Sequence, residues 1–278
     1  MASEKLAIHV RPGSTPQTII RLTDAMIQSG SRFASVKELL DFSNSLGLGT
    51  YSEIKTSLVE FGFIDETKDG IILSDGGQDF TRISSDAQAD VLHVLMYIGW
   101  SETAPLNFLP SWAYRRCCDT YWDAGGFEIT SAFLDHLVEG TTSAARETFS
   151  NTGAAVDEVS FSRDSVRGIH KWLEPLNPPV LIEKRFKRRN FCPPAALSLA
   201  LGWVIRDLRA IEDSDILLTP QKQEALCRIC LLEPIALNRA LDWAIVSYPN
   251  LYSQAARSGV FGRTIRLKHR PTLQDFIA

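Results

Sequence analysis

The sequence lacks the long hydrophobic runs and paired cysteine motifs that assign many proteins to a class at once. Its longest apolar runs, such as residues 195–205, are too short to span a bilayer, and residues 1–14 contain no secretory apolar core. The five cysteines are few and odd in number, which favours a reducing compartment over a disulfide framework. We therefore expect a soluble, cytoplasmic protein with no membrane partner.

Motifs for nucleotide, metal or acyl chemistry are also missing. The chain has no GxxxxGKS/T or GxGxxG loop, no HExxH pair and no Ser-His-Asp spacing. Cys227 and Cys230 form a lone CxxC, whereas zinc sites usually need two such pairs. The same segment fits an amphipathic helix, in which cysteine is a small core residue. We expect no catalytic residue, no metal and no cofactor.

The small net charge conceals a marked asymmetry. The total is -4, but residues 1–83 carry 8 basic and 11 acidic residues, and residues 84–160 carry 3 and 11. Residues 161–278 carry 18 basic and 11 acidic residues, which gives +7 against -3 and -8 for the two earlier segments. A basic final third indicates that a polyanionic partner would bind there.

The first 80 residues contain a regular succession of predicted helices followed by a predicted hairpin. Helices are predicted over 14–30, 35–47 and 50–63, because each segment has helical apolar spacing and the first two begin near Ser or Thr. Two short apolar runs, at 63–64 and 71–73, then flank a polar stretch that ends in Asp69-Gly70, which is typical of a hairpin. A further helix follows from residue 76.

This order resembles that of the winged helix-turn-helix superfamily. The resemblance rests on residues 35–80, with Gly62-Phe63-Ile64 leading into the wing and Leu73-Ser74 opening the last helix. It implies a DNA-binding fold in which the third helix enters the major groove. Here that helix offers Ser52, Lys55 and Thr56, with a single positive charge. The N-terminal domain could therefore contact DNA or dock on protein, and both alternatives stay open.

A stronger electrostatic signal lies at residues 162–189. Arg163, Arg167 and Lys171 form one stripe of a predicted helix, opposite an apolar stripe. A strand pair is predicted next, over 180–183 and about 189–192, and the segment between these strands is strongly basic. A basic helix followed by a basic hairpin again resembles a recognition helix with its wing, and the helices at 109–123 and 129–140 would precede it. Residues 141–160 are expected to form one helical turn and a loop.

The candidate DNA-binding residues share positive charge, hydrogen-bonding capacity or, for one aromatic side chain, the ability to stack on a base. They are Arg163, Arg167, Lys171, Lys184, Arg185, Phe186, Lys187, Arg188, Arg189, Ser52, Lys55, Thr56, Arg266 and Lys268.

The C-terminal part repeats the pattern more weakly, with helices over 194–211, 220–231 and 235–247 and a basic hairpin at 252–270. It could be a further winged-helix unit or an extension that docks on the preceding helices, and the second alternative is slightly favoured.

Taken together, the sequence predicts a mainly α (α+β) fold of tandem winged-helix-like units with short hairpin wings. The expected domains are 1–100, 101–194 and 195–278. The expected function is non-catalytic binding of double-stranded DNA, as a regulator, a replication initiator or a subunit of a mobile-element or phage-defence complex. The alternative is an adaptor whose winged helices dock on protein, with a protein partner or a second copy of the chain.

Overall fold

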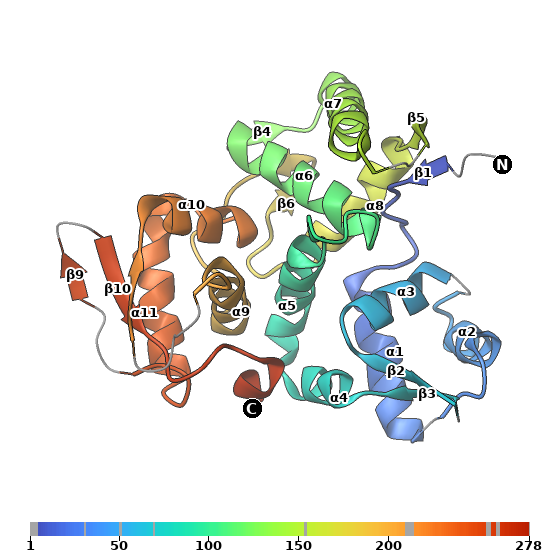
Figure 1. The fold of residues 1–278 in the computed structure, drawn as a ribbon, viewed down its shortest axis with the longest axis horizontal. Helices are drawn as coiled ribbons and strands as arrows, with labels where there is room; N and C mark the ends of the chain where they lie inside the picture. The colour runs from blue at the N-terminus through green and yellow to red at the C-terminus, as the bar shows by residue number, and fades with distance from the viewer. Residues whose placement is uncertain are drawn as a thin grey trace.

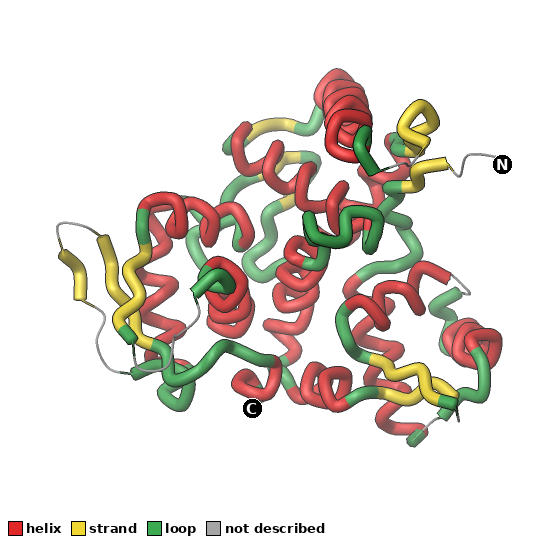
Figure 2. The backbone as a smooth tube through the Cα atoms, in the orientation of Figure 1, coloured by secondary structure: helices red, strands yellow, loops and turns green. Residues whose placement is uncertain are grey.

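The computed structural model describes residues 5–30, 32–49, 52–68, 70–152, 155–208, 214–253, 257–259 and 262–277. Within these residues the chain is mainly helical, with eleven α-helices and a few short strands in small sheets. The mainly α class predicted from the sequence is confirmed. Figure 2 shows the strands as short segments among and around the helices.

The first set of elements, unit 1 (residues 16–73), has the predicted order. It contains α1 (Pro16–Ser29), α2 (Val36–Ser45), α3 (Ser52–Glu60), β2 (Ile64–Thr67) and β3 (Gly70–Leu73). Between α1 and α2, the backbone of Phe33 bridges to Ile71 of β3 and adds a minimal first strand. Thr15 caps α1 and Ser35 caps α2, because each side-chain oxygen accepts a bond from a backbone N–H of the first turn.

Two helices leave unit 1 and lead into the centre of the molecule. They are α4 (Asp75–Arg82), capped by Ser74, and α5 (Ser85–Ile98). The helix α5 is buried on nearly all sides and packs against α1, α6, α9 and α10. Such a helix belongs to the interior of a protein rather than to its surface. Figure 1 shows α5 in the middle of the molecule, with unit 1 on one side of it.

The second set, unit 2 (residues 109–186), surrounds the predicted basic helix. It contains α6 (Leu109–Ala124), β4 (Phe127–Glu128), α7 (Ser131–Phe149), β5 (Ala155–Ser160), α8 (Arg163–Leu173), β6 (Leu181–Ile182) and β7 (Arg185–Phe186). The turn and loop expected over 141–160 were wrong, because α7 continues to Phe149 and β5 follows it. The predicted strand at 180–183 contains β6, but the strand expected at about 189–192 was misplaced, since the hairpin turns at Glu183-Lys184 and the second strand is Arg185–Phe186.

The third set, unit 3 (residues 194–266), contains α9 (Pro194–Val204), β8 (Asp215–Leu218), α10 (Pro220–Ile229), a 3-10 turn η1 (Pro234–Ala236), α11 (Leu237–Ser247), β9 (Arg257–Gly259) and β10 (Gly262–Arg266). A final 3-10 turn, η2 (Leu273–Phe276), follows. This segment contains a further set of elements, and α11 also packs on the preceding helices α9 and α10, so the two alternatives, a further unit or a docked extension, both stay predictions.

The three units share one topology. Each runs helix, strand, helix, helix, strand, strand, except that unit 2 inserts β5, which pairs with β1, between its second and third helices. In each three-stranded set, the third strand lies between the first and the second. The sheet orders are β4-β7-β6 in unit 2 and β8-β10-β9 in unit 3, and the Phe33 bridge gives the same order in unit 1. Short strands close the end of each helical unit and leave α3, α8 and α11 as corresponding third helices.

The units are not separate bodies, because one buried hydrophobic cluster runs from Leu6 to Phe276. The N-terminal strand β1 (Lys5–Ala7) pairs in parallel with β5 of unit 2. The indole Nε1 of Trp172 in α8 donates to the Ser14 carbonyl at 2.6 Å, beside α1. The predicted divisions at 100 and 194 separate the three sets of elements, but they cut through a common core.

His93 at the centre of α5 gives this core a pH dependence. The Tyr114 hydroxyl donates to its Nδ1 (2.6 Å), and its Nε2 donates to the Ile229 carbonyl (2.7 Å). Burial, with a further effect of the Arg189 charge, lowers the pKa of His93 to about 3. The folded protein therefore holds a neutral imidazole under conditions in which the unfolded chain binds a proton.

We predict that the free energy of unfolding falls as the pH drops below the unfolded pKa of His93, 6.5, towards 3. The slope from this residue is about 1.4 kcal/mol per pH unit, because only the unfolded state gains the proton. Urea unfolding of the wild type and of His93→Gln between about pH 7 and pH 5 measures it. The stability advantage of the wild type should shrink towards acid, and parallel profiles would contradict the assignment.

Candidate nucleic-acid interface

The helix α8 holds its position through both ends and through its buried face. Ser162 and Ser165 form a capping box at its start. Val166, Ile169 and Leu173 face the core, as the sequence predicted. Gly168 lies against the Val10 carbonyl so closely that any side chain would collide with it. The polar face of α8 is thereby fixed towards solvent.

That polar face carries the three predicted cations, and each of them pairs with an acid. Arg163 forms a bidentate ion pair with Asp135 of α7. Arg167 pairs with Asp164 (2.7 Å), and Lys171 pairs with Glu174 (2.9 Å). The six side chains are between 47% and 75% exposed. Ion pairs this exposed contribute little to stability, so the cations can exchange partners at little cost.

The β6–β7 hairpin beside α8 is the most basic exposed feature of unit 2. Glu183 and Lys184 occupy its two-residue turn with φ values of 49° and 62°. This left-handed pair matches the right-handed twist of a tight hairpin. Lys184, Arg185 and Lys187 are exposed, and none forms an ion pair with a residue that the structure describes. We call these three side chains the wing cations.

Phe186 does not belong to this surface, and its prediction as a base-stacking residue was wrong. Its side chain is 1% exposed and packs among the rings of Tyr121 and Phe127, with centroids 5.4 and 5.7 Å away. In a hairpin, neighbouring residues point to opposite faces, so Phe186 faces inward where Arg185 and Lys187 face outward. The sequence carried this alternation, because Phe186 is the one apolar residue within the basic run.

Arg188 serves mainly to join the units. Its guanidinium lies 4.2 Å from the Trp122 ring centroid and donates to the Trp122 carbonyl. It also pairs with Glu233 at 3.5 Å. Little of its charge is available to a ligand, although the residue was predicted to bind DNA.

Arg189 is fully buried, so its prediction as a DNA contact was also wrong. Its guanidinium forms an ion pair with the buried carboxylate of Asp90 and donates to the Cys230 and Asn177 carbonyls. It also donates to the Cys192 sulfur at 3.3 Å. Burial raises the pKa of Asp90, whereas the Arg189 charge and the Asn177 N–H favour its ionised form. Arg189 therefore acts as a structural cation at the meeting point of α5, the end of unit 2 and unit 3.

A hollow lies between α7, α8 and the hairpin of unit 2. It has a volume of about 320 Å³ and is lined by Ser131, His170, Glu174, Glu183, Lys184 and three aliphatic side chains. His170 lies 2.7 Å from the Tyr121 hydroxyl, and burial lowers the pKa of His170. The two glutamates make this hollow unsuited to a phosphate, so the basic surface beside it is the better candidate.

The third helix of unit 1 offers little to an anion. Ser52 and Thr56 are exposed, but Lys55 pairs with Glu66 of β2, and Glu53 pairs with Arg11 at 3.2 Å. In unit 3, Arg266 pairs with Asp215 (2.7 Å) and Lys268 donates to the Pro249 carbonyl. None of these predicted residues lies with the wing cations, because each belongs to a different unit.

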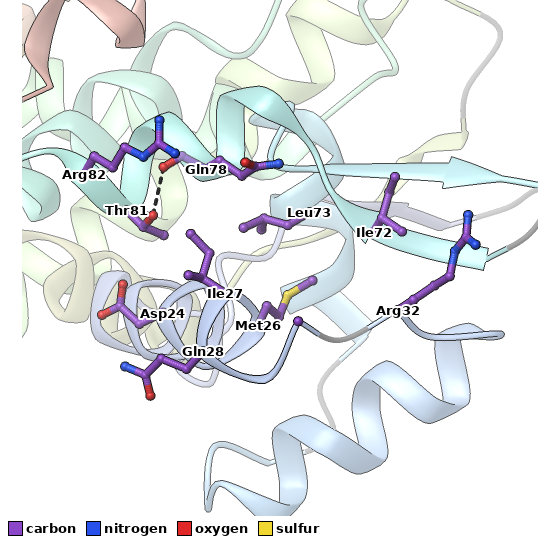
Figure 3. A pocket seen from close by; sticks show the side chains of 11 residues that line it. Asp24, Met26, Ile27, Gln28, Arg32, Ile72, Leu73, Gln78, Thr81 and Arg82 are labelled. Atoms are coloured by element: carbon purple, nitrogen blue, oxygen red, sulfur yellow. Dashed lines mark hydrogen bonds between the residues drawn. The ribbon is translucent and has the colours of Figure 1, made fainter.

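A larger hollow in unit 1 was not predicted from the sequence. It measures about 590 Å³ and lies between α1, β3 and α4, with Met26, Ile27 and Leu73 among its apolar lining residues and Asp24 and Arg82 among its charged ones (Figure 3). Burial raises the pKa of Asp24. No residue spacing marks such a hollow, because it arises where three elements meet.

The five cysteines are free and buried. Within the described ranges, no group of three or more His, Cys, Asp or Glu side chains is placed to hold a metal ion. No helix in this part of the chain is long and apolar enough to cross a membrane. A scan against protein-family models and searches of curated proteins and solved structures found no match to the chain.

We predict that Arg189→Met lowers the free energy of unfolding by about 3–5 kcal/mol, because Asp90 would remain buried without its counter-ion. Chemical denaturation measures the loss. The control is Lys187→Met, two residues earlier and exposed, which should change stability by less than about 0.5 kcal/mol. The double variant Arg189→Met/Asp90→Leu should recover part of the loss, since no unpaired charge is then buried. Equal effects of the two single variants would contradict the structural role.

Proposed function

We propose that this chain is a non-catalytic protein that binds double-stranded DNA through unit 2. The observation that carries the proposal is the set of three unpaired, exposed wing cations beside a third helix with three further cations. Phosphate contacts supply most of the affinity for DNA, and they require mobile positive charge of this kind. The shared topology of the units supports placement in the winged helix-turn-helix superfamily.

The proposed roles of the wing cations and of α8 follow from which of the charges are already paired with acids. The wing cations bind backbone phosphates directly, since they release no acidic partner. The helix α8 enters the major groove, where Arg163 and Arg167 exchange their carboxylate partners for phosphate or guanine. Because Asp135, Asp164 and Glu174 oppose this exchange, binding is expected to be weak at ordinary salt without a favourable sequence.

Unit 1 is proposed to contact protein rather than DNA, as the adaptor alternative predicts for the whole chain. The observation in favour is that Lys55, the one cation on the exposed face of α3, is neutralised by Glu66. A subunit that reads DNA with unit 2 and docks with its other units would suit a regulator, an initiator or a larger DNA-bound assembly.

The wing cations can be tested by removing them together. We predict that Lys184→Ala/Arg185→Ala/Lys187→Ala weakens binding to random duplex about tenfold or more at low salt, and reduces the slope of log K against log salt by about 2–3. Fluorescence anisotropy at several salt concentrations measures both quantities. Arg188 and Arg189 are left unchanged because they hold the units together.

The matched control is Lys37→Ala/Lys68→Ala/Arg82→Ala, which removes the same charge from exposed positions of unit 1 and α4. It should leave the salt slope within about 1 of the wild type. Equal losses for the two triple variants would mean that DNA senses only the net charge, and the proposed interface would be rejected.

The acids on α8 give a prediction of the opposite sign. Asp164→Asn/Glu174→Gln frees Arg167 and Lys171 and removes two negative charges from the face of α8. We expect tighter binding of duplex DNA and a steeper salt dependence, measured in the same titration. The control Asp41→Asn/Glu60→Gln changes exposed acids of unit 1 and should leave affinity nearly unchanged. Equal gains from both pairs would argue against DNA contact by α8.

A further inference from the structure

The outward face of α11 in unit 3 is apolar where the corresponding face of α8 is basic. On α11, Val246 is 79% exposed and Trp243 57%, and Ile235, in the 3-10 turn η1 that leads directly into α11, is 90% exposed. Large hydrophobic side chains this exposed, close together along one helical segment, are typical of an interaction surface. The opposite face of α11, with Leu237, Ala240, Leu241 and Ala244, is buried and packs on α9 and α10. The fold of unit 3 therefore does not need the exposed face.

The exposed residues form one narrow stripe. At 100° per residue, positions 239, 242 and 246 of α11 fall within an arc of about 60°, and Trp243 borders it. Ile235, in the 3-10 turn η1, precedes Arg239 by about one turn. Arg239 and Asp242 are the charged members of this stripe, and both are exposed. We call Ile235, Arg239, Asp242, Trp243 and Val246 the α11 stripe.

Contacts at its edges hold the α11 stripe in place. Arg239 donates to the Asn190 carbonyl at 3.0 Å, and Asp242 pairs with Arg263 of β10 at 2.5 Å. The Trp243 ring meets Phe191 edge-on, with centroids 6.5 Å apart. A surface that is already ordered loses little conformational entropy when it binds a partner.

We propose that the α11 stripe binds a second copy of this chain, with the two α11 helices antiparallel about a two-fold axis. When the axis passes between positions 240 and 241, Ile235 meets the partner's Val246, and Arg239 meets the partner's Asp242. The two apolar residues and the two charged residues are each placed symmetrically about this midpoint. A two-fold contact of one surface with itself requires such self-complementarity.

The pattern of charge favours this occupant over others. A parallel pair of α11 helices would oppose Arg239 with the partner's Arg239, whereas the antiparallel pair opposes it with an acid. DNA would meet one acid and three hydrophobic side chains on this face. The α11 stripe shares no residue with α8 or the wing cations, so the inference is independent of the proposed DNA contact.

The first experiment measures the mass of the full chain by sedimentation velocity and by light scattering, up to about 100 µM, which covers the weak dimers expected of small interfaces. The expected mass rises to twice 31.0 kDa. Ile235→Glu and Val246→Glu should each raise the dimer dissociation constant at least about tenfold, because each places a charge in the apolar contact. Circular dichroism confirms that the variants are folded.

The matched control is Ile182→Glu, which changes another exposed hydrophobic side chain, 58% exposed, on the hairpin of unit 2. It should dimerise as the wild type does. A monomeric wild type throughout the concentration range would overturn the proposal, and α11 would then be assigned to a different protein. A dimer that tolerates Ile235→Glu and Val246→Glu would overturn it as well, because its interface would lie elsewhere.

A charge-reversal experiment tests the antiparallel register. Arg239→Asp places two acids on the α11 stripe, and Asp242→Arg places two arginines there, so each variant alone should dimerise at least about tenfold more weakly. Mixing the two variants should restore dimers, because every charge then faces its opposite. If mixing restores nothing while Arg239→Asp and Asp242→Arg both remain folded, the antiparallel pairing is wrong.

Discussion

The buried ion pair between Arg189 and Asp90 is the constraint that joins units 2 and 3 to the central helix α5. Arg189 follows the hairpin of unit 2, Asp90 lies on the central helix α5, and the guanidinium also reaches the Cys230 carbonyl in unit 3. The backbone of Arg189 adds a bridge to Leu232. Two charges removed from water need each other, so the position of each of these segments depends on the others.

This constraint divides a basic segment that looks uniform in the sequence. Five cations lie between residues 184 and 189, and the first three of them face solvent while Arg188 and Arg189 face the core. Arg188 covers Trp122, and Arg189 neutralises a buried acid. Charge density alone therefore added two residues, Arg188 and Arg189, that do not belong to the proposed DNA-binding surface. Phe186 is a third residue that has to be removed from it.

The sequence predicted those features of the fold that local physics decides. The helix starts near Ser or Thr, the Gly70 hairpin and the apolar face of α8 depend on neighbouring residues, and the structure confirms them, with Thr15 and Ser35 as the caps. The sequence did not predict the partner of Arg189, because Asp90 is 99 positions away. The strand β5 was missed for the same reason, because its stabilising partner, β1, is far from it in the sequence.

Three copies of one topology carry three different surfaces. The exposed face of the third helix is nearly neutral in unit 1, basic in unit 2 and apolar in unit 3. The opposite faces of α3, α8 and α11 are all buried in the core. A fold constrains the inward side chains and leaves the outward ones free to vary, so topology alone does not assign a function to any unit. Each assignment has to come from the exposed face. By that criterion, the proposals for units 2 and 3 rest on the basic exposed face of the one and the apolar exposed face of the other.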